Sequence, residues 1–247
     1  MKKIAALFAL VAVNTVCFAQ EETEWKDASK ESQAYHEYRL KLSRPPDGLA
    51  KVTALLEKTP VADDGQNVLP QKEYMALSLR EKFTYHMIHA ESYSQNCDAR
   101  PPIQDEQKKI FAELPDAFGE ANWSQRQRNF LSSNRDSVIA LLSASIARSS
   151  RVGVNYKLAI SETNGRELIP LLISTYKKER KDHDILTLLM LLMVKGEYAP
   201  FMSSPSYKKL YTSEQSSYDA YLNYNQANED LIIQRATAYY DGLPKKG

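Results

Sequence analysis

The sequence predicts an all-α protein in which helical hairpins stack into a short array behind an N-terminal helical region. Good helix formers dominate, alternating β-branched residues are scarce, and the 247-residue chain has 43% hydrophobic residues and only 8 glycines. Three similar apolar segments, residues 137–142, 167–172 and 197–202, recur at a spacing of thirty residues, with further apolar segments between them at 154–160 and 184–190. A fixed period in this range is typical of stacked helical hairpins. The alternative is an irregular helical bundle in which the spacing arises by chance.

Residues 1–19 have the pattern of a secretory signal peptide. Lys2 and Lys3 precede a ten-residue apolar run, and the small residues Cys17 and Ala19 stand where a signal peptidase requires them, so we expect cleavage before Gln20. The run is too short to span a bilayer. A lipid anchor on Cys17 is the competing interpretation, although the residues before it differ from those that such an anchor needs. The short signal with two lysines indicates a bacterial envelope protein that is periplasmic or secreted.

The charge balance of the remaining chain argues against nucleic acid as a partner. The whole chain has 32 basic and 31 acidic residues, so removal of Lys2 and Lys3 leaves the chain nearly neutral. Such a chain has no general electrostatic attraction to a polyanionic backbone. The longest apolar run after the signal peptide, residues 185–194, is too short for a transmembrane span and predicts a buried helix.

The chain divides into N-terminal helices with a linker at residues 20–70 and an all-α domain at 71–247. Within the first part, residues 59–70 contain two prolines and an Asp-Asp-Gly sequence, which predicts the linker, and Asp47 is expected to cap a short helix before it. In the second part, Ser78 and Glu81 form the pattern of a capping box, and Asn134 is the expected cap of the first repeat helix. Helices are predicted over residues 79–90, 103–114, 124–131 and, as one long terminal helix, 214–241.

The repeated segments resemble a known class of helical repeat. The second copy contains Leu168, Ile169, Pro170, Leu171 and Leu172, with an acidic residue before it and another apolar helix about fifteen residues on. This pattern resembles the short HEAT-type repeat and covers roughly residues 134–210. The resemblance implies antiparallel helix pairs that stack into a curved solenoid, whose concave surface binds other macromolecules.

A group of metal-competent side chains lies in and after the helix predicted at 79–90. His86 and His89 are three residues apart and can share one side of a helix, and Cys97 follows in a loop. Imidazole and thiolate are ligands of zinc, so His86, His89 and Cys97 form a candidate metal site. Cys97 could also act as a nucleophile with a histidine base. The alternative is structural, because His86 lies on the apolar face of its helix and would then be a hydrogen-bonded core residue.

Tyrosine is unusually frequent, with 15 residues, and several cluster near the C-terminus. Tyrosine combines a large apolar ring with a polar tip and is enriched at protein interfaces. Tyr211, Tyr218, Tyr221 and Tyr224 are therefore the candidate partner-binding residues. The alternative is ordinary packing at the edge of a helical core.

A basic cluster follows the second repeat helix, where Lys177, Lys178, Arg180 and Lys181 complement the helix dipole and predict a solvated connection. The sequence contains none of the motifs H-E-x-x-H, G-x-S-x-G, G-x-x-x-x-G-K-[ST] or G-x-G-x-x-G. We therefore expect an exported, non-enzymatic interaction protein, without a cofactor, that binds a protein or other envelope component. The alternative is a metal-dependent or thiol enzyme that uses His86, His89 and Cys97, with zinc as the metal.

Overall fold

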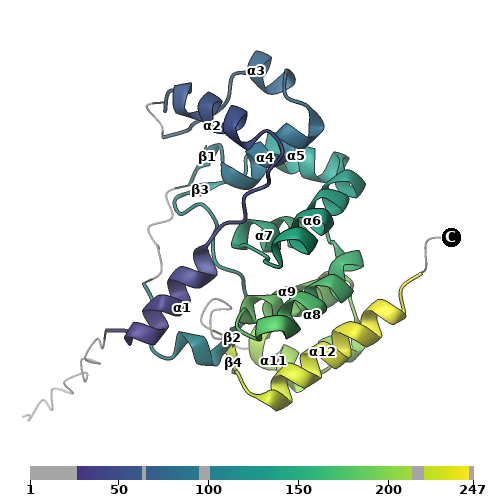
Figure 1. Cartoon of the computed structure of the whole chain (residues 1–247). Helices are drawn as coiled ribbons and strands as arrows, with labels where there is room; N and C mark the ends of the chain where they lie inside the picture. The colour runs from purple at the N-terminus through teal and green to yellow at the C-terminus, as the bar shows by residue number, and fades with distance from the viewer. Residues whose placement is uncertain (1–26, 63–64, 95–100, 213–219, 245–247) are drawn as a thin grey trace, which may run out of the picture.

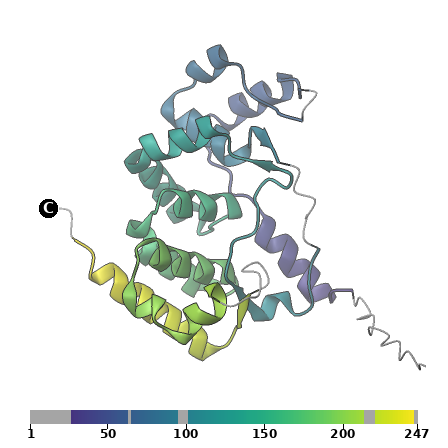
Figure 2. The same cartoon turned by 180° about the vertical axis from the view of Figure 1, so that it is seen from behind.

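The computed structural model describes residues 27–62, 65–94, 101–212 and 220–244, and in these ranges it is mostly helical. The predicted all-α class is confirmed. Figure 1 and Figure 2 show the elements as successive layers, from an N-terminal group of short helices at the top of Figure 1 to the C-terminal helix at the bottom. No helix in the described ranges is long and apolar enough to cross a membrane.

The N-terminal layer is built from α2 (Leu49–Lys58), α3 (Gln71–Met75), α4 (Leu79–Ile88) and α5 (Gln125–Ser133), with the short paired strands β1 (Ser92–Tyr93) and β3 (Ala121–Asn122). The predicted capping box of α4 is present, since Ser78 accepts from the Glu81 amide and Glu81 accepts from the Ser78 amide. Ser124 and Gln127 form a second capping box on α5. Asp47 does not cap α2, because Gly48 precedes this helix in a left-handed conformation. A small separate core lies between α2, α3 and α4, whereas α5 and the other face of α4 pack into the main core; the separate core consists of Val52, Leu69, Tyr74, Leu77 and Tyr85.

Two helical hairpins with the same design form the middle of the molecule. The first pairs α6 (Arg135–Ser149) with α7 (Val154–Glu162), and the second pairs α8 (Ile169–Glu179) with α9 (His183–Lys195). Residues thirty positions apart are buried in both hairpins. These equivalent positions are Val138 and Leu168, Leu142 and Leu172, and Ile146 and Tyr176. Both first helices end in a left-handed residue, Ser150 (φ 53°) and Arg180 (φ 50°). The spacing seen in the sequence is therefore a repeat of structure.

The third copy of the repeat is shorter than the other two. It contains α10 (Ala199–Met202) and α11 (Pro205–Tyr211), and α12 (Gln226–Asp241) then packs across both helices of the second hairpin. Asn134 occupies the N-cap position of α6 as predicted, but its side chain makes no capping hydrogen bond and donates back to the Phe130 carbonyl at 3.0 Å. A short 3-10 helix, η2 (Arg166–Leu168), leads into α8. Two full hairpins do not confirm a HEAT-like solenoid, which normally needs three or more units.

Two segments predicted as helix form strands instead. Residues 103–114 contain the 3-10 helix η1 (Glu106–Lys108) and β2 (Lys109–Phe111), and the start of the expected terminal helix contains β4 (Tyr221–Asn223). β2 and β4 pair antiparallel, with Ile110 opposite Leu222. Burial alternates from Ala220 to Asn223, which is the pattern of a half-buried strand. The helical prediction was wrong for residues 109–111 and 221–223 because these residues form a non-local strand pair. The terminal helix itself is confirmed from Gln226 to Asp241, and it starts later than predicted, where the Asn225 side chain caps it.

The first helix, α1 (Lys30–Leu40), packs along the lower layers and not against the helices that follow it in sequence (Figure 1). Its partners are η1 and the start of α9, and the segment after it reaches α7, where the Val154 amide donates to the Lys41 carbonyl at 3.2 Å. The described part of residues 20–70 therefore packs on both the N-terminal layer and the hairpins.

The contact between this segment and α7 leaves no room for a side chain at Gly153. A methyl group there would lie 2.1 Å from the backbone nitrogen of Ser43 and 2.7 Å from its hydroxyl. We expect Gly153→Ala to lower the free energy of unfolding by about 1–3 kcal/mol, measured by urea denaturation. Gly242→Ala is the matched control, because the nearest atom would be 3.5 Å away, and it should change stability by less than about 1 kcal/mol. Equal effects from the two variants would contradict the close approach of Ser43 to α7.

Candidate functional site

The two histidines of the candidate metal site are both engaged in packing. His86 is fully buried in α4, its Nε2 lies 3.1 Å from the Tyr74 hydroxyl, and burial lowers its pKa to about 3. His89 follows α4 and donates from Nε2 to the Asn67 carbonyl at 2.6 Å, and burial lowers its pKa too. Cys97 lies outside the described residues. Within the described ranges, no three His, Cys, Asp or Glu side chains are placed to hold a metal ion, and the structure does not test a site that includes Cys97.

The four candidate tyrosines differ in how much of each ring is available. Tyr211 donates to the Ala112 carbonyl at 2.9 Å, and Tyr224 donates to Glu229 at 2.9 Å while its ring stacks on His183. Tyr221 lies on β4 with the ammonium groups of Lys109 and Lys209 at 4.7 and 5.8 Å from its ring. Tyr218 lies outside the described residues. Tyr211 and Tyr224 thus each use the hydroxyl in a hydrogen bond within the protein, and Tyr221 is the described candidate best placed to contact a partner.

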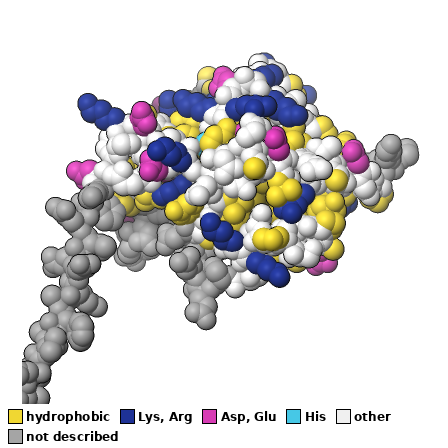
Figure 3. Space-filling model, turned by 90° about the horizontal axis from the view of Figure 1, so that it is seen from below, with side chains coloured by type: hydrophobic (Ala, Val, Ile, Leu, Met, Phe, Trp, Pro, Cys, Tyr) yellow, Lys and Arg dark blue, Asp and Glu magenta, His cyan; other side chains and the backbone are white. Residues whose placement is uncertain are grey.

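Figure 3 shows the lower face of the molecule, where Lys and Arg side chains are spread between apolar ones. The strands β2 and β4 lie in this lower part of the fold in Figure 1.

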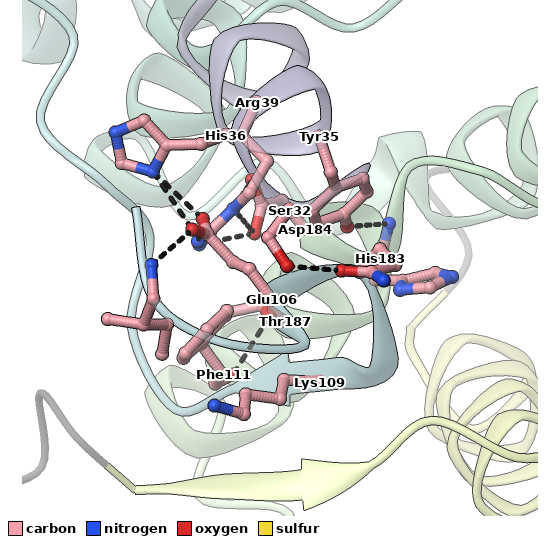
Figure 4. Close-up of polar contacts among 12 residues, drawn as sticks. Ser32, Tyr35, His36, Arg39, Glu106, Lys109, Phe111, His183, Asp184 and Thr187 are labelled. Atoms are coloured by element: carbon pink, nitrogen blue, oxygen red, sulfur yellow. Dashed lines mark hydrogen bonds and ion pairs between the residues drawn. The ribbon is translucent and has the colours of Figure 1, made fainter. Parts of the chain in front are cut away.

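A buried charge cluster, which the sequence did not predict, joins α1 to the second hairpin (Figure 4). Arg39 donates from Nε and Nη2 to Asp184 at 2.9–3.1 Å and from Nη1 to Glu106 at 2.5 Å. Lys157 donates to Asp182 at 2.6 Å and lies 3.8 Å from Asp184. All five side chains are buried, and Glu106 and Asp184 are only 1% exposed. Charges that are removed from water in this way need partners of opposite sign, which each group has here.

The electrostatics of the cluster favour ionised carboxylates at its centre. Burial acts to raise the pKa of Asp184, but the neighbouring Arg39 and Lys157 outweigh it and hold the pKa below its usual range. Burial likewise opposes ionisation of Glu106, and the hydrogen bonds from His36 and Arg39 lower its pKa. The Arg39 guanidinium therefore satisfies the hydrogen-bonding and charge requirements of Glu106 and Asp184, and they satisfy those of Arg39. The arrangement is an anchor for α1 rather than a centre with a free acid or base.

A hollow of about 510 Å³ lies beside this anchor, between α1, the segment around Gln107 and the turn before α9. Tyr35 and His183 form its buried wall, and the Tyr35 hydroxyl accepts from the His183 backbone amide at 3.2 Å. The other residues that line it include acids and cations: Glu31, Ala34, Gln107, Glu179, Arg180 and Lys181. Burial lowers the pKa of His183 to about 4, so its ring is neutral near pH 7.

Mostly exposed cations gather next to this hollow, at the turns that close the two hairpins. We name this surface the turn ridge, and it consists of Arg148, Arg151, Lys177, Lys178, Arg180 and Lys181 with the ring of Tyr38. The Arg151 guanidinium and the Lys181 ammonium each lie 4.5 Å from the centre of the Tyr38 ring. Lys178 donates to the Ser150 hydroxyl of the other turn at 2.8 Å. Apart from Arg180, which lies 3.4 Å from Glu229, none of these cations pairs with a carboxylate in the described part of the chain.

The basic cluster predicted at residues 177–181 is thus only half of the surface. Its other half comes from the equivalent turn thirty residues earlier, where Arg148 and Arg151 correspond to Lys178 and Lys181. The thirty-residue period of the sequence could have predicted that these two basic turns lie next to each other.

No protein family, curated protein or solved structure matches this chain.

Proposed function

We propose that this protein is an exported, non-enzymatic interaction protein that binds a protein of the bacterial envelope through the turn ridge of its two hairpins. The observation that carries the proposal is the recurrence, at equivalent positions of successive hairpins, of cations that have no carboxylate partner among the described residues. Export is supported by the signal-peptide pattern of residues 1–19.

The ridge suits recognition better than it suits stability. Exposed charges contribute little to folding even when they are paired, so cations that pair with no acid in the described chain gain little stability from ion pairing. A local concentration of one charge steers a partner of opposite charge and accelerates its association. The two hairpins hold these cations on one rigid edge, because equivalent residues of packed repeats lie side by side.

Site-specific cross-linking in cells tests this assignment. A photo-reactive residue is placed at Ser149 or Glu179, which are exposed equivalent positions of the two turns, and at Lys72, which is exposed on α3. We expect the two turn positions to give an adduct of the same mass in the envelope fraction, because one partner touches both, and Lys72 to give none. The proposal is wrong if neither turn position yields an adduct, or if Lys72 yields the same one.

A further inference from the structure

We propose that the turn ridge recognises an extended acidic segment of its partner protein, in which carboxylates recur about every third residue. This inference rests on the proposed function and adds the chemistry and the spacing of the partner. The contacts of Tyr38, the charge of the two turns and the packing distance of the hairpins each support one part of it.

The two turns carry a strong local charge within a nearly neutral chain. Residues 148–151 and 177–181 hold six cations and one acid, Glu179, whereas the whole chain has 32 basic and 31 acidic residues. Charges interact over about 8 Å at physiological ionic strength, and the acids beside the ridge, which are Glu179, the buried Asp182 near Arg151 and Glu229 near Arg180, are fewer than its six cations. A partner that approaches this edge therefore meets a positive surface.

Helix dipoles explain some of these cations but not the pair that flanks Tyr38. Arg148, Lys177 and Lys178 lie in the last turns of α6 and α8, where a cation contributes about 0.3–1 kcal/mol by complementing the dipole. Arg151 and Lys181 lie beyond the helix ends. Both contact the Tyr38 ring, so two like charges are held near each other without a described carboxylate within ion-pair distance. An anion between them would relieve their repulsion.

The composition of the ridge favours a carboxylate chain over a membrane. An arginine guanidinium matches the geometry of a carboxylate, and arginine occurs in both turns. Membrane-surface binding normally adds large apolar side chains beside the cations. The large apolar residues exposed in the described part of the chain are Leu40, Val61, Val68, Met75, Leu79, Tyr93, Ile103 and Tyr240, and none lies in the two turns.

The stacking of the hairpins sets the expected spacing of the acids. Packed helices such as α6 and α8 lie about 8–10 Å apart, so equivalent cations such as Arg148 and Lys178 recur along the ridge at roughly that distance. An extended chain in the polyproline II conformation advances about 3.1 Å per residue with three residues per turn, so side chains three residues apart lie about 9 Å apart on the same side. One carboxylate per hairpin therefore corresponds to an acid at every third residue.

Binding of defined peptides to the full purified protein tests the inference. The probe is a fluorescent peptide with glutamate at every third residue, and a peptide of the same composition with adjacent glutamates tests the spacing. We compare a ridge variant, Arg148→Gln, Lys178→Gln and Lys181→Gln, with a control variant of equal charge, Lys58→Gln, Lys72→Gln and Lys208→Gln. All six positions are exposed, and Arg151 is left intact because it also donates to the Tyr38 carbonyl.

We expect the wild-type protein and the control variant to bind the spaced peptide within about twofold of each other, and more tightly than the clustered peptide. The ridge variant should bind roughly tenfold more weakly, since each lost exposed ion pair is worth up to about 1 kcal/mol. Equal binding by both variants would overturn the inference, as would wild-type protein that ignores both peptides or binds only vesicles of anionic lipid. In those cases a common adduct from Ser149 and Glu179 would still support the proposed function, so the two failures are distinguishable.

Discussion

Acidification from pH 7 to pH 5 should lower the free energy of unfolding by about 2–4 kcal/mol, because buried histidines must take up protons when the chain unfolds. His86 is fully buried in α4 and has its pKa lowered to about 3, and His183 is 5% exposed with its pKa lowered to about 4. An unfolded histidine titrates near 6.5. Both groups thus contribute stability that is present above pH 6.5 and is lost as the pH falls toward their folded-state pKa values.

Stability falls as the pH falls because the unfolded state binds more protons than the folded state. At pH 5 the unfolded chain carries about two more protons at these positions than the folded chain, so stability falls by up to about 2.7 kcal/mol per pH unit near that pH. The pKa of His89 is also lowered by burial, and this residue acts in the same direction. Below the histidine range, the lowered pKa values of Glu106 and Asp184 continue the loss, whereas the raised pKa of Asp182 opposes it.

Urea denaturation between pH 5 and pH 8 measures this dependence. The variants His86→Gln and His183→Gln each remove one titrating group, so each should reduce the slope of stability against pH by roughly half, whatever its effect at pH 7. The comparison of slopes is informative even if one variant is less stable. A wild-type protein whose stability is constant from pH 7 to pH 5 would show that these histidines are not buried in neutral form.

Local sequence signals predicted the elements that depend on local interactions. The capping box at Ser78 and Glu81 is confirmed, and the thirty-residue spacing corresponds to two hairpins with equivalent buried positions. The strands were missed because their stability comes from pairing between residues 109–111 and 221–223, which no local window contains. The apolar residues of a short strand and of a helical turn look alike when that partner is unknown.

The buried anchor was missed for the same physical reason. Arg39 and Asp184 are 145 residues apart, and neither position stands out by spacing or motif. One signal was present, because Arg39 follows Tyr35 by four residues and so lies on the same stripe of the first helix. A charged residue on a stripe that packs inward requires an ionic partner, although the sequence alone does not identify it.

Removal of the Arg39 side chain is expected to cause the largest loss of stability among these variants. Arg39→Met leaves Glu106 and Asp184 buried without the guanidinium that bridges them, and uncompensated buried charges of this kind cost about 3–5 kcal/mol. Arg39→Lys should recover only part of the loss, because an ammonium group cannot donate the forked hydrogen bonds that reach both acids.

Removal of the two uncompensated carboxylates should restore part of the stability lost in Arg39→Met. In the background of Arg39→Met, the changes Glu106→Gln and Asp184→Asn should restore about half of the lost stability, because neutral amides are less costly to bury than carboxylates. In the wild-type background, the same two changes should destabilise the protein, since they break the hydrogen bonds to Arg39. Urea denaturation of these variants forms a mutant cycle, and additive effects would mean that Arg39 does not interact with the two acids. A strong coupling would instead show that one buried ion cluster fixes α1 to the second hairpin, and thereby positions Tyr38 between Arg151 and Lys181 on the turn ridge.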